Sequence, residues 1–162
     1  MSIIDVLTSL EESGLGIAIS ESEWLFPTIE TIHVLALALV IGSIAMLDLR
    51  LLGVSSRDRG VMELADDTLP WTWGAFVVAA ITGSLMFISA ATRYYENVPF
   101  RVKLVLLALA GLNMAIFHLT AYRAAHSWDR RLPTPAAARV AASLSLLFWA
   151  GVVVFGRWIG FV

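Results

Sequence analysis

Ionisable side chains interrupt long apolar stretches of this sequence, and they are the residues best able to do chemistry. One stretch carries Glu30 and His33, with Asp48 at its far end, and a later stretch carries Lys103 and His118. A charged side chain in hydrocarbon is costly, so each is a functional candidate by default. At about 100° per residue, Glu30 and Asp48 lie on one meridian of a helix, with His33 about 60° away. We expect these three to face the interior of a helix bundle.

Two of these residues, His33 and His118, suggest a haem site. Neutral imidazoles on facing helices can be the axial ligands of a b-type haem in a four-helix membrane bundle. Arg157 and Lys103 would then offset the charge of the propionates. Counted at 1.5 Å per residue, the two imidazoles differ in depth by roughly 9 Å, part of which helix tilt could remove. In the simpler interpretation, each histidine forms a hydrogen bond with a neighbour inside the bundle.

A copper site is a second metal hypothesis. Met114 precedes His118 by four residues on one helix face, and a thioether with an imidazole suits Cu(I). The pair supplies only two ligands, however, and methionine at helical spacing usually serves packing. Glu30-Thr-Ile-His33 matches one element of a di-iron bundle, but the second element that such a site needs is missing.

A structural interpretation treats polar residues as a clamp that fixes the register of the helices. Its candidates are Glu30, Asp48 and Asn113. Glu30 would pair with a cation at its own end of the bundle, because pairing relieves the cost of two buried charges. The cations available there are Arg157, Lys103 and Arg101. Asp48 would form an interfacial ion pair with Arg50 or Arg123.

The elements that position these residues follow from composition. The chain has 162 residues, 59% hydrophobic and 15% charged, with no cysteine and a formal net charge of −2. Soluble domains average about 45–50% apolar and about 25% charged residues. The composition excludes a disordered chain, a disulfide framework and a nucleic-acid binder that relies on positive charge. A membrane-crossing helix needs roughly 20 apolar residues, and four stretches qualify, at about 25–47, 73–91, 104–122 and 140–162.

Short polar segments separate these stretches, so each helix should run antiparallel to the next. Pro70 stands where the second helix is expected to begin, and Thr134 is the expected N-cap of the fourth. In residues 1–20, apolar residues recur at helical spacing with acidic residues opposite. This predicts an amphipathic helix at the membrane interface, ended by Gly14 and Gly16.

The predicted fold is all-α, with residues 21–162 forming one antiparallel bundle of four transmembrane helices and residues 1–20 a short interfacial helix. Basic residues favour the cytoplasmic side of short loops. Three lie at the first connection and four at the third, against four on the opposite side. We therefore expect a multi-pass protein with both termini outside, which is periplasmic in a bacterium.

The lipid bilayer is the partner that the sequence predicts most directly, and no nucleic-acid partner is expected. Small residues form one stripe at Ala75, Ala79 and Gly83, and another at Gly156 and Gly160. Such stripes allow close packing of membrane helices. They would serve the bundle itself, a homo-oligomer or a larger membrane complex.

Several motifs extend along most of the chain. They include Trp24-Leu-Phe-Pro-Thr-Ile-Glu-Thr-Ile-His33, Asp48-Leu-Arg-Leu-Leu-Gly53, Pro70-Trp-Thr-Trp-Gly74, Thr82-Gly83, Phe100-Arg-Val-Lys103, Gly111-Leu-Asn113 and Phe117-His118. Together they resemble an uncharacterised family of small four-span bacterial membrane proteins, a domain of unknown function. The resemblance implies a location in the bacterial inner membrane, and it implies no activity and no functional residues.

The sequence holds no His-Glu-x-x-His, no Gly-x-Ser-x-Gly and no phosphate-binding glycine loop. We therefore expect an accessory membrane role and no enzymatic activity. Electron transfer through a haem is the most specific testable version of that role. One alternative is a structural subunit of a complex. Another is a pathway for protons or a small solute along Glu30, His33 and Asp48, which would need water on that meridian.

Overall fold

The computed structural model describes residues 2–130 and 132–161, and within them the chain forms helices and no strand. The elements are α1 (Ile3–Glu11), α2 (Gly14–Glu21), α3 (Leu25–Leu51), α4 (Val61–Ile88), α5 (Ala91–Glu96), α6 (Val98–Leu119), η1 (Tyr122–Ser127), α7 (Ala136–Trp158) and η2 (Ile159–Phe161). Four of them, α3, α4, α6 and α7 continued by η2, are 22 to 28 residues long and apolar enough to cross a membrane. The chain is a multi-pass membrane protein, and the predicted all-α fold is confirmed.

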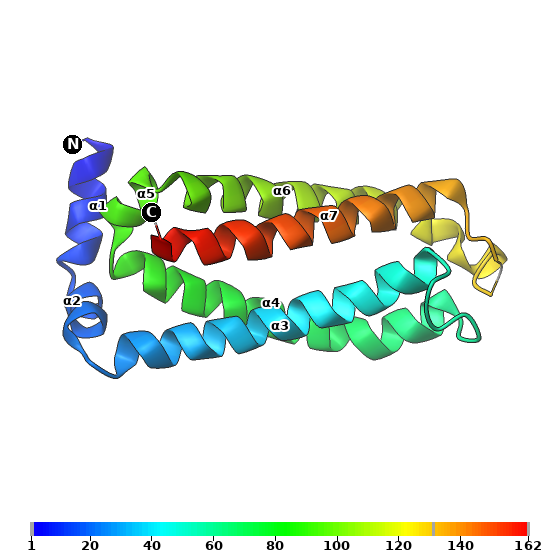
Figure 1. Cartoon of the computed structure of the whole chain (residues 1–162), viewed down its shortest axis with the longest axis horizontal. Helices are drawn as coiled ribbons and strands as arrows, with labels where there is room; N and C mark the ends of the chain where they lie inside the picture. The colour runs from blue at the N-terminus through cyan, green and yellow to red at the C-terminus, as the bar shows by residue number, and fades with distance from the viewer. Residues whose placement is uncertain (1, 131, 162) are drawn as a thin grey trace.

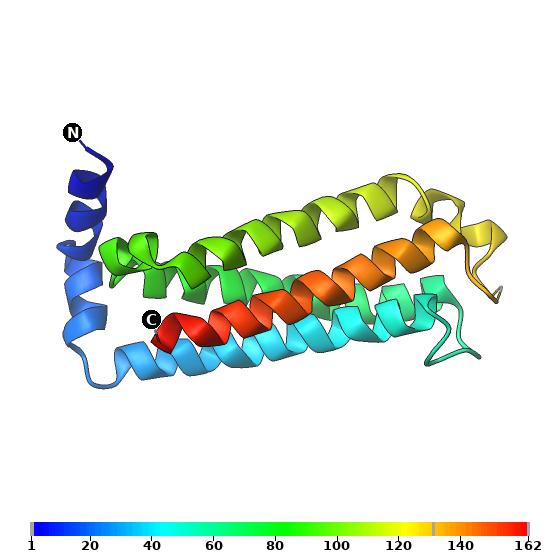
Figure 2. The same ribbon diagram turned by 45° about the horizontal axis from the view of Figure 1, so that its top comes forward.

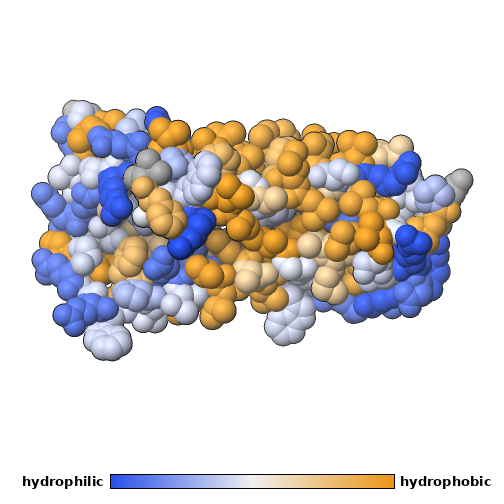
Figure 3. Space-filling view, in the orientation of Figure 1, coloured by the Kyte–Doolittle hydropathy of each residue, from blue (hydrophilic) through white to orange (hydrophobic). Residues whose placement is uncertain are grey.

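The four spans form two antiparallel hairpins (Figures 1 and 2). α3 packs along α4 and α6 along α7, and the hairpins are joined mainly through α3 and α7. α4 and α6, both described over their whole length, do not pack along each other. Both termini lie at one end of the bundle, the terminal end, and the connections after α3 and α6 lie at the other, the loop end (Figure 1). Hydrophobic residues fill the middle of the visible face, between hydrophilic ends (Figure 3).

Local signals set the ends of α3 and α6. Gly53 adopts a φ of 71°, which favours glycine, just after α3. The N–H groups of Gly53 and Val54 then donate back to carbonyls of the last turn, at 3.0 and 2.9 Å, the pattern of a glycine C-cap. α6 begins after Asn97, whose side-chain oxygen accepts the N–H of Phe100 at 2.9 Å.

α4 starts earlier than its apolar run predicts. It begins at Val61, so Pro70 lies inside the helix and not at its start. The early start is explained by a distant residue. The main-chain oxygen of Asp129 accepts the Val61 N–H at 3.2 Å, and its carboxylate accepts the Met62 N–H at 2.7 Å. These bonds satisfy donors that the first turn of a helix leaves free.

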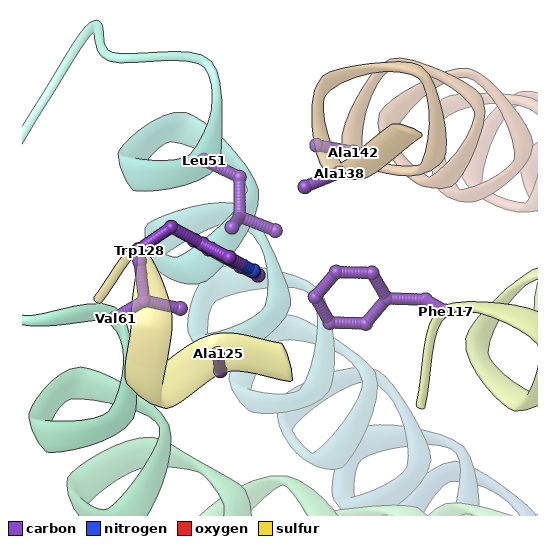
Figure 4. Close-up of a cluster of buried hydrophobic side chains, with 7 residues drawn as sticks. All are labelled: Leu51, Val61, Phe117, Ala125, Trp128, Ala138 and Ala142. Atoms are coloured by element: carbon purple, nitrogen blue, oxygen red, sulfur yellow. The ribbon is translucent and has the colours of Figure 1, made fainter. Parts of the chain in front are cut away.

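The loop end is a packed core to which five elements or their flanks contribute (Figure 4). Its buried side chains are Leu51, Val61, Phe117, Ala125, Trp128, Ala138 and Ala142. Thr134 is not the N-cap of α7, because Pro135 occupies that position. The Thr134 hydroxyl instead donates to the carbonyl of Leu51. It therefore fastens the last connection to the end of α3.

The N-terminal segment forms two short helices across the terminal end, where one was predicted (Figures 1 and 2). Gly14 and Gly16 lie inside α2, because the Ser13 hydroxyl caps this helix by accepting the Gly16 N–H at 3.1 Å. Glu11 of α1 accepts both the N–H and the hydroxyl of Thr92 in α5, each at 2.7 Å. The segment is thereby fixed to the bundle.

Candidate functional site

A cavity of about 200 Å³ lies between the two hairpins, toward the loop end, and all four spans line it. Most of its wall is apolar. Four of the described lining residues are exposed, Trp73 and Phe76 on α4 and Gly111 and Met114 on α6. They mark its mouth on the side where α4 and α6 do not pack together. The cavity therefore opens sideways, toward the region that a bilayer occupies.

Asp48 is the acidic residue of the cavity wall. Its side chain is buried, with 6% of the residue exposed. The Ser145 hydroxyl of α7 interacts with the carboxyl group, whereas Oδ2 has no hydrogen-bond partner in the described chain. Among the residues that the structure describes, no lysine or arginine lines the cavity. A buried carboxyl oxygen without a partner is costly, and in a native fold such a group calls for an explanation.

The expected ion pair between Asp48 and Arg50 is not formed. Arg50 is fully buried, with its Nε donating to the carbonyl of Arg59 at 2.7 Å and its Nη2 to that of Asp129 at 3.1 Å. Residues two apart on a helix point about 200° apart. Arg50 therefore faces the two connections while Asp48 faces the cavity. Within the described residues, Asp48 forms no ion pair with Arg123 either.

Other polar side chains of the wall form hydrogen bonds between helices. The Thr72 hydroxyl donates to the Ser43 hydroxyl at 2.7 Å and joins α4 to α3. The Asn113 amide donates to the carbonyl of Ala141 at 2.9 Å and joins α6 to α7. The clamp interpretation requires contacts of this kind.

His118 forms its hydrogen bond within its own helix. Its Nδ1 donates to the carbonyl of Met114 at 3.0 Å, so in the neutral ring Nε2 is left as an acceptor. The imidazole packs against the rings of Phe117 and Tyr122, with centroids 5.6 and 5.0 Å away. His118 lines the cavity beside Met114.

His33 lies at another level of the bundle, in the contact between α3 and α4. Its Nδ1 is 3.0 Å from the carbonyl oxygen of Ala79 and 2.9 Å from the Thr82 hydroxyl. Lys103 of α6 is close enough to act electrostatically on His33, and His118 follows Lys103 by 15 residues. At 1.5 Å per residue this is about 22 Å. The structure therefore does not bring the two imidazoles together across one haem.

Glu30 does not face the interior as expected. Its side chain is exposed, and it pairs with none of the expected cations in the described chain. The guanidinium of Arg157 lies over the ring of Phe161, 4.8 Å from its centroid. Burial raises the pKa of the Tyr94 phenol, while the charges of Arg93 and Glu30 act on it in opposite directions. Glu30 therefore lies near α5, at the end of the bundle, where a long side chain can reach the surface.

An apolar layer separates the polar groups of the two ends. It consists of the buried residues Val40, Ala75, Ala110, Trp149 and Val152. On α3 this layer, at Val40, falls between His33 and Asp48. A proton or solute pathway along the predicted meridian would have to cross it. The described residues also contain no group of three or more His, Asp or Glu side chains that could hold a metal ion.

A family model matches residues 11–162, which include all four spans and the whole cavity wall. The chain belongs to the Family of unknown function (DUF6644). The predicted membership of an uncharacterised family is thereby confirmed. No curated protein and no solved structure matches this DUF6644 chain.

The sequence interpretation assigned no role to Ser145 or Trp149, which this DUF6644 chain places in the cavity wall. One signal could have found them. Together with Ala142 they recur three and four residues apart, which puts all three on one face of a helix. The isolated polar residue on that face, Ser145, is the one that interacts with Asp48.

Proposed function

We propose that this protein is a non-catalytic, accessory protein of the bacterial inner membrane that binds a lipophilic small molecule in the cavity between its hairpins. One observation carries the proposal: Asp48, a buried acid with an unpartnered oxygen, lies in the wall of an apolar cavity that opens toward the bilayer. Ligand sites combine apolar walls with a small number of convergent polar groups in this way.

The route of entry supports a ligand that is dissolved in the membrane. The mouth between α4 and α6 is flanked by exposed aromatic and thioether side chains, Trp73, Phe76 and Met114. At the loop end, the packed core around Trp128 separates the cavity from the connections. A molecule that reaches Asp48 would therefore come sideways from lipid.

The functions considered from sequence draw less support from the structure. A haem held by both His33 and His118 requires imidazoles at one level, and they lie at different levels. A proton pathway requires water where the apolar layer lies. The bonds of Thr72 and Asn113 join neighbouring helices, as the clamp interpretation requires, and such bonds are compatible with a cavity-bearing accessory protein.

The orientation proposed from sequence places the loop end in the cytoplasm and both termini in the periplasm. Both termini do lie at one end of the bundle (Figure 1). The basic residues Arg57, Arg59, Arg123 and Arg130 belong to the connections at the other end. Positive charge favours the cytoplasmic side, which supports this orientation.

Binding of a neutral fluorophore tests the proposal. The protein in phosphatidylcholine nanodiscs is titrated with N-phenyl-1-naphthylamine, and the signal of empty discs is subtracted. Gly111 is an exposed residue of the cavity wall on α6, and a Cβ there meets nothing within 4 Å, so a leucine at this position would narrow the mouth of the cavity without a clash. We expect Gly111→Leu to weaken saturable binding at least about tenfold, which equals 1.4 kcal/mol.

Gly74→Leu is the matched control. Gly74 is an exposed helical glycine with equally open surroundings, but it does not line the cavity. This variant should bind the fluorophore as the parent protein does. Equal affinities in both variants, or no saturable binding by the parent, would refute a ligand site in the cavity.

A further inference from the structure

We infer that the ligand of this cavity is a lipophilic cation, a positively charged centre carried on an apolar body, with Asp48 as its counter-ion. The inference rests on the proposed function, because it names the class of molecule that the same cavity takes. It follows from three features of the wall: an acid with one unpartnered oxygen, the absence of lysine and arginine among the described lining residues, and aromatic rings.

The acid of the wall has no cationic partner among the described residues. Asp48 is the only acidic residue of the wall, more than nine-tenths buried, and Oδ2 has no partner among the described residues. His118 is the one other ionisable residue in the described part of the wall, and its Nδ1 donates to the carbonyl of Met114 in its own helix. A carboxylate in a low-dielectric site is stable only when a positive charge or several donors face it. A cationic ligand supplies that charge, whereas a neutral alcohol or ketone does not.

The aromatic residues favour the same ligand class. Phe117 and Trp149 are buried in the wall, and Trp73 and Phe76 stand at the mouth, with their rings edge to face at 6.1 Å. The faces of such rings attract cations, and more strongly where water is excluded. The aromatic rings and Asp48 together form a wall that suits a cation that has lost its hydration water.

Small inorganic cations do not suit this wall. Divalent ions bind six or more oxygens, or several imidazole and carboxylate ligands. The described chain offers no cluster of three such groups, and apolar side chains surround Asp48. An organic cation places its charge at Asp48 and its hydrocarbon against those side chains, so both parts of the wall are used.

Radiolabelled tetraphenylphosphonium is the probe, titrated into the full-length protein in phosphatidylcholine nanodiscs. We expect saturable binding that Asp48→Asn weakens at least about tenfold, because the counter-ion is removed while the shape of the side chain is kept. Asp66→Asn removes the same charge from an exposed position on α4 outside the cavity. It should leave the affinity unchanged.

Neutral N-phenyl-1-naphthylamine separates this inference from the proposed function. Asp48→Asn should bind the neutral probe within about twofold of the parent, which also shows that the variant is folded. Suppose that the neutral probe binds in the cavity. If tetraphenylphosphonium does not bind, or binds the parent and Asp48→Asn with equal affinity, the cation inference fails and the proposed function stands. If Gly111→Leu changes the binding of neither probe, both fail.

A second variant tests the aromatic contribution without touching the acid. Phe76→Leu keeps an apolar side chain at the mouth, where the residue is partly exposed. We expect a several-fold loss of tetraphenylphosphonium affinity, in the range that one cation–π contact supplies, and no change for the neutral probe. Equal losses for both probes would overturn the role of this ring.

Discussion

Helix α4 packs closely against α3 along one side, an interface that we call the seam. On another side α4 faces α6 across the open cavity. In the seam, Ala75 and Ala79 are buried, and the absence of a side chain at Gly83 leaves room for the imidazole of His33. Polar groups there find partners across the seam, as His33 and Thr72 do. In the cavity, Asp48 keeps an oxygen without one.

This difference shows how polar residues within apolar spans can be told apart. Where two helices approach closely, a polar side chain reaches a carbonyl or hydroxyl of its neighbour and serves the fold. Where the helices stay apart, such a group is left for a ligand. An unpartnered atom in the cavity wall, and not polarity alone, is therefore the mark of a site. Among the described residues the buried Nη1 of Arg50 also lacks a partner, but Arg50 does not line the cavity. Four substitutions test this distinction, and they are ordered by the size of the expected effect.

Overfilling the seam should have the largest effect on stability. A Cβ at Gly83 would already lie 3.1 Å from Cε1 of His33, so Gly83→Leu must push α3 and α4 apart. We expect a loss of about 2–3 kcal/mol in the free energy of unfolding, near the upper end for overpacked sites. Denaturant titration in detergent measures it, with Gly74→Leu as the control. A stable Gly83→Leu variant would contradict the closed seam.

Replacing the carboxyl group of Asp48 should raise the free energy of unfolding, whereas Gly83→Leu lowers it. Asp48→Asn relieves a buried carboxyl group that has no cationic partner, so we expect the apo protein to gain about 1–2 kcal/mol in unfolding free energy. The same titration, without added ligand, reports this gain. A marked destabilisation would mean that Asp48 serves the fold, as the groups of the seam do.

Breaking the bond between α6 and α7 should have a moderate effect. Asn113→Leu removes the amide that donates to the carbonyl of Ala141. Bonds of this kind between membrane helices contribute about 0.6 kcal/mol on average and up to about 1.7 kcal/mol. We expect a loss within that range, read from the denaturation midpoint. If the loss is absent, Asn113 does not hold the two helices in register.

The smallest effect is expected at Thr72, where the seam borders the cavity wall. Thr72→Val keeps the shape of the side chain and removes the hydroxyl that donates to Ser43, while Ser43 still donates to the carbonyl of Leu39 at 2.8 Å. The loss should be about 0.6 kcal/mol or less. Combining it with Asp48→Asn should give additive changes, because no bond joins these residues. A coupling well above about 0.5 kcal/mol would show that seam and cavity are one network.

The spans could be predicted because each is a long apolar run, and run length is a property of one segment. The start of α4 could not, since Asp129, 67 residues away, supplies the groups that cap Met62 and its neighbour. Residues 61–72 also include Glu63, Asp66 and Asp67, which interrupt the apolar pattern although the helix continues through them.

Part of the candidate site could be recognised from the sequence, because a polar or thioether side chain in an apolar span stands out within a single segment. Four residues named there line the cavity, Asp48, Asn113, Met114 and His118, while the metal and clamp roles given to them stay predictions. Their partners could not be predicted, since these depend on how the two hairpins sit against each other. The expected pair of Asp48 with Arg50 illustrates this point. The two residues lie at nearly the same depth on α3, but their side chains point to opposite sides of the helix and cannot pair.

The contacts of Arg50 affect how freely the connections can change in sequence. Its guanidinium is held by the main-chain oxygens of Arg59 and Asp129, and every amino acid carries such an oxygen. Substitutions at those two positions therefore leave these acceptors in place, whereas the donor fork is supplied by arginine alone. A single arginine can accordingly tolerate sequence changes in both connections, provided that their lengths keep the same two carbonyls within reach.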